Sequence, residues 1–245
     1  MAVDLGTGDS ISAGRITETE SAGNFTYSFW ARRIGGNNKV INIGKGPNYT
    51  NDEFIALFHT DAALYLQNRP AYNTYSGITP TKLQHFFVVW DGSQGTNADR
   101  MKLWVDGVFK SPTSTNGTFA ATSPSNTNNW QIGIRASTGG SSSGEVAEFK
   151  VWSNSLGESE AKSDYVGVVP SRDTLVCWRP LGWADPDPDY SGQSVDGTVT
   201  GTPTLVDGPP IASSFGFDED ITYTVSPAPT GHGLLLATQR NQLVF

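Results

Sequence analysis

The chain has 245 residues, with 24 acidic against 16 basic side chains and no lysine- and arginine-rich run. Because phosphate binding requires clustered cations, this charge pattern excludes nucleic acid as a main partner. Cys177 is the single cysteine, which excludes an intrachain disulfide or a cysteine metal site. No stretch reaches the roughly 18 apolar residues of a membrane span, and 27 glycines and 14 prolines argue against long helices.

The first half of the chain contains short apolar or alternating segments that predict β-strands. In the first of them Phe25, Tyr27, Phe29 and Ala31 share one face. The last is apolar on both faces and is expected in the middle of a sheet. Residues 69–77 between them predict a loop that carries two tyrosines. The predicted strands are 25–33, 40–43, 54–59, 64–67 and 85–90.

The second half continues with strands and one helix. Asp106-Gly107 predicts a tight hairpin turn. Residues 111–129 predict a long connection with a weak strand near Phe119. Strict alternation in 145–152 would place Val146, Glu148 and Lys150 opposite Ala147, Phe149 and Val151. A helix is expected at 155–165, where Glu158 and Lys162 are spaced i,i+4. The predicted strands are 101–105, 108–110, 130–134, 145–152 and 175–178.

Three segments together resemble one known family. They read FTYSFWARR at 25–33, HFFVVWDGS at 85–93 followed by MKLWVDGV at 101–108, and GEVAEFKVWSNSLGESEAKSDY at 144–165. In this order they resemble the laminin-G-like family of concanavalin A-like lectin and glucanase jelly rolls. LVCWRPL at 175–181 and DYSGQ at 189–193 resemble that family's final strand and Asp-x-Ser-Gly turn.

The resemblance implies an all-β fold, a two-sheet antiparallel jelly-roll sandwich with six or seven strands in each sheet. It covers residues 1–207, and the many short strands favour a sandwich independently. Residues 208–245 fall outside it and predict a separate C-terminal extension with two strand-like runs.

Some jelly rolls of this kind are laminarinase-type glycoside hydrolases, which place catalytic carboxylates on one strand face. The nearest match here is Glu145 and Glu148, with Ala147 at the intervening acid position. Regular alternation would point the two carboxylates to opposite faces. No G-x-S-x-G elbow is present, and His85 is expected as a satisfied, partly buried residue. We therefore expect no enzymatic activity.

Calcium is the one candidate ion, and no cofactor motif is present. Calcium prefers six to eight oxygen ligands. Asp185, Asp187 and Asp189 form the densest acidic group and are the candidate ligands. The alternative is that they are solvated turn residues.

Carbohydrate binding requires aromatic side chains that stack on a sugar, together with polar groups for its hydroxyls. Tyr72 and Tyr75, with Arg69 and Asn73 nearby, fit that chemistry, as does Trp183. The alternative is that these aromatic residues pack within their loops. Core positions are expected instead for the strand tryptophans Trp30, Trp90 and Trp152.

The C-terminal extension is too apolar for a free solvated arm, because an unpaired apolar strand favours aggregation. We expect it to pack on the sandwich or to mediate homo-oligomerisation or docking to a larger assembly. The candidate docking residues are Ile221, Tyr223, Leu234, Leu235, Leu236 and Phe245.

Two functions remain open. The first is a non-catalytic structural or decorating component of a virus particle, in particular of a phage, assembled in the host cytoplasm and able to bind glycans. It is favoured by the N-terminal MAVDLGTGDS, which lacks a signal-peptide pattern, and by the apolar extension. The alternative is a carbohydrate-binding or adhesion module at an extracellular or cell-surface location. Under both hypotheses we expect neither nucleic acid nor a membrane as a partner.

Overall fold

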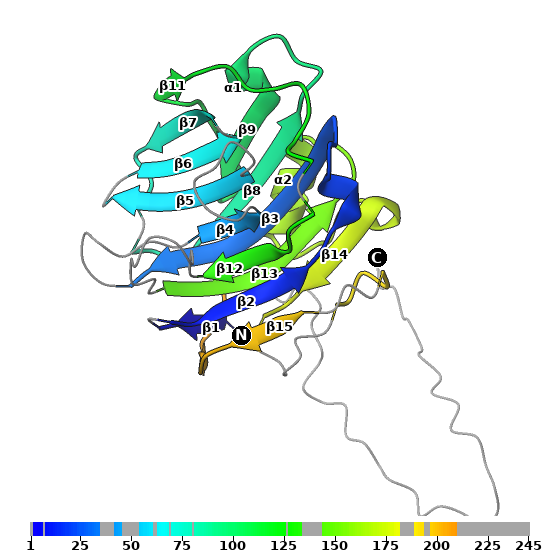
Figure 1. The fold of residues 1–245 in the computed structure, drawn as a ribbon. Helices are drawn as coiled ribbons and strands as arrows, with labels where there is room; N and C mark the ends of the chain where they lie inside the picture. The colour runs from blue at the N-terminus through cyan, green and yellow to red at the C-terminus, as the bar shows by residue number, and fades with distance from the viewer. Residues whose placement is uncertain are drawn as a thin grey trace, which may run out of the picture. The chain divides into compact units, whose positions relative to one another are not determined.

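The computed structural model describes residues 2–6, 8–34, 42–45, 54–60, 63–68, 70–79, 81–125, 127–133, 144–181, 189–193 and 197–209, with only the backbone at 42 and 54–60. These residues form two eight-stranded antiparallel sheets (Figure 1). The all-β sandwich expected from the sequence is confirmed, with more strands in each sheet than the six or seven expected.

The first sheet carries both halves of the chain side by side. Its strand order is β10-β9-β8-β3-β13-β1-β16, and β14 pairs with β13. In chain order its strands are β1 (Ala2–Leu5), β3 (Asn24–Arg33), β8 (Gln84–Asp91), β9 (Met101–Val105), β10 (Val108–Lys110), β13 (Gly144–Trp152), β14 (Leu175–Arg179) and β16 (Thr204–Val206).

The second sheet has the order β11-β7-β6-β5-β4-β12-β2-β15. Its strands are β2 (Ser10–Gly14), β4 (Asn42–Lys45), β5 (Phe54–Thr60), β6 (Ala63–Asn68), β7 (Ala71–Ser76), β11 (Ser114–Asn116), β12 (Trp130–Gly133) and β15 (Thr198–Thr200). The predicted loop at 69–77 is thus mostly strand β7, because its alternating residues pair with β6 in continuous register.

The core lies between the inward faces of the two sheets. From β3, the predicted face of Phe25, Tyr27 and Phe29 points inward and is fully buried. Trp130 of β12 packs across from it, with its ring centroid 5.3 Å from that of Tyr27. Such interdigitated aromatic rings bury large apolar areas and hold the two sheets together.

The described helices are short. They are η1 (Thr17–Thr19), α1 (Asn97–Arg100), α2 (Glu158–Tyr165) and η2 (Arg172–Thr174). In α2 the predicted pair is present, with Lys162 Nζ 2.6 Å from Glu158 Oε1. This helix packs on the outward face of the first sheet, where Tyr165 lies against Trp30 with ring centroids 5.7 Å apart. None of the described helices is long and apolar enough to span a membrane.

The Asp106-Gly107 turn joins β9 to β10 as predicted, and both residues have positive φ angles, 52° and 74°. This is the backbone that a two-residue hairpin turn requires. The weak strand expected near Phe119 is instead β11, three residues earlier, and Phe119 is buried outside any strand.

Strand β13 departs from the alternation expected of it. A β-bulge shifts its register against β3 between Ala147 and Lys150, with Glu148 at a φ of 53°. The extra residue reverses the faces of the later residues of the strand. Val146 and Phe149 therefore both point into the core.

The sandwich extends to β16, which pairs with β1 at the edge of the first sheet. Residues 210–245, including all candidate docking residues, lie outside the described residues. The boundary at 207 and the role of the C-terminal extension therefore stay predictions.

Candidate functional site

The outward face of the second sheet follows from simple alternation along β6 and β7. Leu64 and Leu66 belong to the core, so Tyr65 and Gln67 point outward. On β7 the core residues are Ala71 and Tyr75, which places Tyr72 and Thr74 on the outward face. We call this outward surface of the second sheet the polar face.

Two tyrosines lie together on the polar face. The ring centroids of Tyr65 and Tyr72 are 5.7 Å apart, with the ring planes at 51°. Both side chains are half-buried, and they come from neighbouring strands. Two tilted aromatic rings on a rigid sheet present apolar surface to a ligand with little entropy to lose on binding.

Small uncharged side chains, all polar except Ala63, make up the rest of the described part of this face. Their neighbours along each strand point inward, in most strands into the core. Because successive side chains of a strand point to opposite faces, these residues point outward. No side chain that the structure describes on this face carries a charge. The described members besides the tyrosines are Ser10, Ser12, Ala63, Gln67, Thr74, Ser76, Ser114, Asn116, Gln131, Thr198 and Thr200.

The structure separates the residues predicted to bind a glycan. Tyr72 lies on the polar face, but Tyr75 and Asn73 are buried between the sheets. Tyr75 donates its hydroxyl to the Met101 carbonyl at 2.9 Å, and burial raises the pKa of this phenol above its usual value. Neither buried side chain is available to a surface ligand, so these two assignments are corrected. Arg69 and Trp183 lie outside the described residues.

Tyr65, which lies beside Tyr72, was not among the residues proposed from the sequence. The signal was present, because Tyr65 stands between two leucines in a segment predicted as a strand. Treating residues 69–77 as a loop removed the neighbouring strand that would have placed Tyr72 beside it. The error arose from the polar composition of β7, which resembles that of a loop.

The proposed calcium ligands are only partly described, since Asp185 and Asp187 lie outside the described residues. Asp189 Oδ1 accepts hydrogen bonds from the backbone N–H groups of Trp178 and Ser191, each at 2.9 Å. Its Oδ2 accepts from Ser191 Oγ at 2.8 Å. This carboxylate therefore holds a turn against β14. Among the described residues no three His, Cys, Asp or Glu side chains converge as metal ligands.

The two carboxylates considered for catalysis do not lie on opposite faces, as regular alternation predicted. The bulge in β13 turns Glu148 toward the same outward face as Glu145. Each is nevertheless held separately: Glu145 Oε1 pairs with Arg32 at 2.5 Å, and Glu148 Oε2 lies 3.1 Å from Lys150 Nζ. Glu148 also accepts from Trp178 Nε1 at 2.9 Å. Both carboxylates are thus engaged in local pairs.

A buried charged cluster lies between α2 and the first sheet. Asp164 Oδ2 accepts from Ser28 Oγ at 2.5 Å and from His85 Nε2 at 2.9 Å. Its Oδ1 lies 3.2 Å from Lys150 Nζ. All four side chains are buried, so His85 is more buried than expected. We call these four residues the Asp164 cluster.

The Asp164 cluster does not form a nucleophilic triad. In such a triad the histidine stands between the hydroxyl and the carboxylate. Here Asp164 is central, and both Ser28 and His85 bind it. Burial alone would raise the pKa of Asp164, but Lys150, His85 and Ser28 outweigh burial and hold it far below its usual range. The cluster fastens α2 to the sheet.

The family of the chain is now established. A family model of the concanavalin A-like lectin/glucanases superfamily matches residues 5–162. The chain belongs to this superfamily, as the ordered segments in its sequence predicted. No curated protein matches it.

Solved structures share the fold at low sequence identity. A Bacteroides ovatus protein named as carbohydrate-binding superposes with a TM-score of 0.59 and 15% identity over 85% of this chain. This chain spans 60% of that protein's length. The module CBM40 of a Ruminococcus gnavus sialidase, solved with α2,3-sialyllactose, gives a TM-score of 0.46 at 11% identity, covering 67% of this chain and 98% of the module. A SAP-like pentraxin from Limulus polyphemus gives 0.43 at 14% identity, covering 79% and 95%.

Proposed function

We propose that this chain is a carbohydrate-binding module that takes neutral glycans on its polar face. The observation that carries the proposal is the tyrosine pair of Tyr65 and Tyr72 on a surface whose described side chains are uncharged. Tyrosine rings stack on the apolar face of a sugar, and the surrounding hydroxyl and amide groups exchange hydrogen bonds with its hydroxyls.

Membership in a superfamily of lectins and glucanases and the shared fold of the Bacteroides protein support this proposal. The engaged carboxylates on β13 favour binding over hydrolysis. Carbohydrate binding, which the sequence left as the alternative, therefore becomes the main proposal. The virus-particle hypothesis gains no support from the fold or the relatives, and the C-terminal extension on which it depends lies outside the described residues.

Binding can be tested on a glycan array followed by affinity electrophoresis of the full chain in gels containing the neutral polysaccharides that score. Tyr65→Ala and Tyr72→Ala should each weaken binding roughly tenfold or more, the range of aromatic hot spots. Phe109→Ala is the matched control, because Phe109 is an aromatic side chain, 46% exposed, on β10 of the other sheet. Absence of any neutral glycan binder, or equal binding by all three variants, would contradict the proposal.

The docking role of the C-terminal extension has its own test. Truncation after residue 209 should reduce oligomeric state or docking if the extension mediates them. An unchanged, soluble product with unchanged oligomeric state would remove that role and leave the glycan proposal intact.

A further inference from the structure

A second aromatic surface lies at β14, on the first sheet. The ring centroids of Tyr190 and Trp178 are 5.8 Å apart, with the ring planes at 55°. Tyr190 is 52% exposed, and Trp178 is half-buried. Trp178 packs on its inner side against the cluster of apolar residues beneath α2. The Tyr190 ring is therefore accessible to a ligand, whereas the Trp178 ring is held by packing.

The backbone beneath this pair is fixed. Tyr190 N–H donates to the Trp178 carbonyl at 2.8 Å, and Trp178 N–H donates to Asp189 Oδ1 at 2.9 Å. Asp189 in turn holds Ser191 through its backbone and hydroxyl. An exposed aromatic ring on a fixed turn loses little conformational entropy when a ligand covers it.

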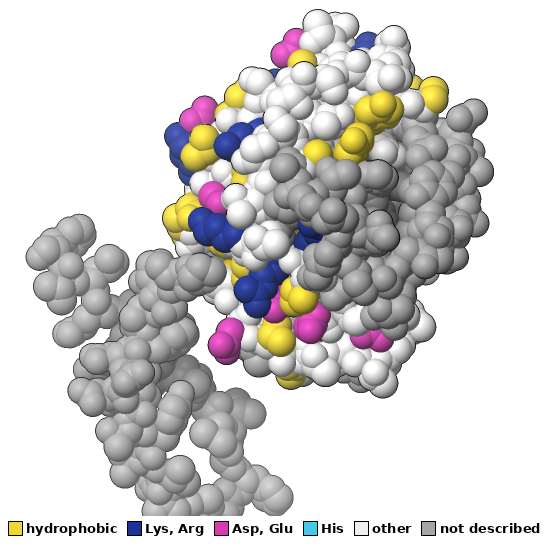
Figure 2. Space-filling view, turned by 90° about the vertical axis from the view of Figure 1, so that its left-hand side faces the viewer, with side chains coloured by type: hydrophobic (Ala, Val, Ile, Leu, Met, Phe, Trp, Pro, Cys, Tyr) yellow, Lys and Arg dark blue, Asp and Glu magenta, His cyan; other side chains and the backbone are white. Residues whose placement is uncertain are grey.

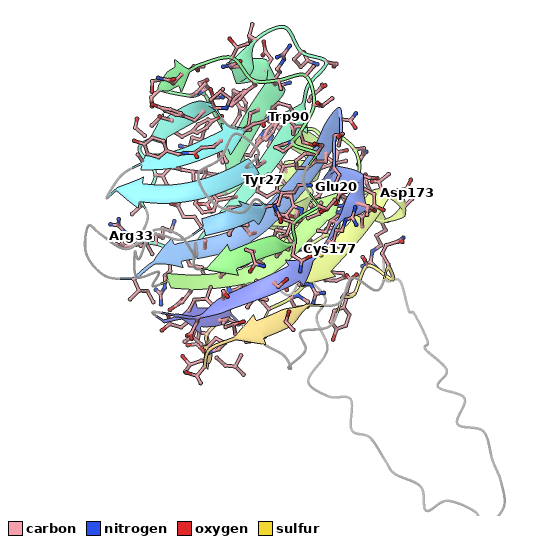
Figure 3. All side chains as sticks on the ribbon, in the orientation of Figure 1. Glu20, Tyr27, Arg33, Trp90, Asp173 and Cys177 are labelled. Carbon is pink, nitrogen blue, oxygen red and sulfur yellow. The ribbon has the colours of Figure 1, made fainter. Side chains whose placement is uncertain are left out.

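A cation stands beside the rings. The Arg172 guanidinium carbon is 5.8 Å from the centroid of the Trp178 ring, and the side chain is exposed. Arg172 belongs to η2, and the next residue, Asp173, is labelled in Figure 3. The structure gives Arg172 no ion pair with any carboxylate in the described part of the chain. Lys150, the other cation near Trp178, is already paired with Glu148 and Asp164.

We propose that Tyr190, Trp178 and Arg172 form a second binding site, which takes a sugar residue bearing a carboxylate or sulfate. The Tyr190 ring covers the apolar face of the sugar, and the guanidinium forms paired hydrogen bonds with the anionic group. The polar face has no described cation to offer such a ligand. The site is separate from the polar face and does not rest on the proposed neutral-glycan function.

The negative net charge of the chain makes binding of an acidic polysaccharide a stringent test of this site. At −8 it repels polyanions as a whole, so retention by an acidic polysaccharide requires a local site. We would measure affinity electrophoresis of the full chain in gels containing polygalacturonate, dextran sulfate or uncharged dextran. Retardation by polygalacturonate assigns a carboxylated sugar, and retardation by dextran sulfate assigns a sulfated one.

Tyr190→Ala and Arg172→Gln should each reduce retardation by the acidic polymer about tenfold in apparent affinity, as expected for an aromatic contact and a charged hydrogen bond. Arg172→Lys should fall between, because lysine keeps the charge and loses the planar fork. Lys82→Gln removes one exposed charge elsewhere and Phe109→Ala one exposed ring, so both should bind as wild type. Tyr65→Ala should also keep acidic binding.

No retardation in either acidic gel overturns the proposal. So does a loss with Lys82→Gln equal to that with Arg172→Gln, which would indicate diffuse electrostatic attraction. Unfolding midpoints equal to wild type would confirm that each variant is folded. If Arg172→Gln unfolds, Arg172→Lys carries the test of the cation.

Discussion

The two outward faces of the sandwich are built in opposite ways. The first sheet buries the Asp164 cluster beneath α2, whereas the second sheet presents hydroxyl groups, amides and the tyrosine pair. In Figure 2 most charged side chains gather on the left, the side at the back of Figure 1 where α2 is drawn. A buried charge left without a partner is costly, and in the Asp164 cluster the carboxylate of Asp164 lies within bonding distance of Lys150, His85 and Ser28. The described side chains of the polar face carry no charge, and several of them, such as Thr74 and Gln131, are partly exposed.

Two buried lysines, one on each sheet, show how a nearby carboxylate changes the pKa of a buried cation. Lys150 on the first sheet faces Asp164 and Glu148; burial would lower its pKa, but the two carboxylates raise it above the usual value. Lys45 on the second sheet donates, among the described residues, to the Thr19 carbonyl and hydroxyl and to no carboxylate. Burial there lowers its pKa to about 8, against a weaker opposing effect of Glu20 (labelled in Figure 3). Both lysines are buried, so the direction of each pKa shift depends on whether a carboxylate lies beside the ammonium group.

The largest effect should follow from breaking the Asp164 cluster. Asp164→Ala leaves Lys150 buried without its partner on α2, and removal of one partner of a buried pair costs about 3–5 kcal/mol. The free energy of unfolding in urea measures this cost. Glu158→Gln, on the exposed side of the same helix, should change it by less than about 0.5 kcal/mol. A loss below about 1 kcal/mol for Asp164→Ala would contradict the claim that the buried pair with Lys150 stabilises the fold.

The same cluster predicts a pH dependence. Since the folded pKa of Asp164 is lowered from 3.8, its contribution is complete above that value and is lost as the pH falls below it. The stability difference between wild type and Asp164→Ala should therefore shrink in acid. Urea unfolding of both proteins from pH 6 to about pH 3 tests this, and a constant difference would contradict it.

A smaller loss is expected from Ser28→Ala, which removes one hydrogen bond to a charged carboxylate. Such bonds contribute about 1.5–3 kcal/mol. Ser76→Ala is the matched control, because Ser76 is an exposed serine at the end of β7. If both serine variants unfold at the same urea concentration as wild type, the hydrogen bond to Asp164 is not stabilising.

Lys45 should make stability rise with pH, as Asp164 does, but in the alkaline range and not in acid. With a folded pKa of about 8 and an ordinary value of 10.5, the unfolded chain binds more protons between these values, so stability rises with pH through this window. Lys45→Met should remove that rise and should not destabilise the protein at pH 7. Thermal unfolding at pH 7 and pH 10 measures both; a marked destabilisation at pH 7 would contradict the burial argument.

The smallest effects belong to the polar face. Gln131→Ala and Thr74→Ala should change the free energy of unfolding by less than about 0.5 kcal/mol, because neither side chain supports the core. Chemical denaturation of the two variants beside Ser28→Ala gives the comparison directly. A loss as large as that of Ser28→Ala would mean that the polar face is structural and would weaken its role as a binding surface.

Much of the fold was predictable from local pattern. The inward face of β3 and the hairpin at Asp106-Gly107 both follow from alternation and turn residues. The site was less accessible. The sequence proposed Tyr72 as a candidate glycan contact but did not place Tyr65 beside it, because the pairing of β6 with β7 brings the two rings together and polar β7 resembled a loop.

Local pattern was enough to predict the strands and turns of the sandwich, because periodic apolar residues and turn chemistry act over a few neighbouring positions. The superfamily was predicted separately, from the resemblance of the ordered segments. Which polar residues meet became clear from the folded arrangement alone. The bulge at Glu148 changes the face of β13, and the Asp164 cluster joins β3, β8, β13 and α2 from distant parts of the chain. Such contacts depend on strand order and register, which local pattern does not encode.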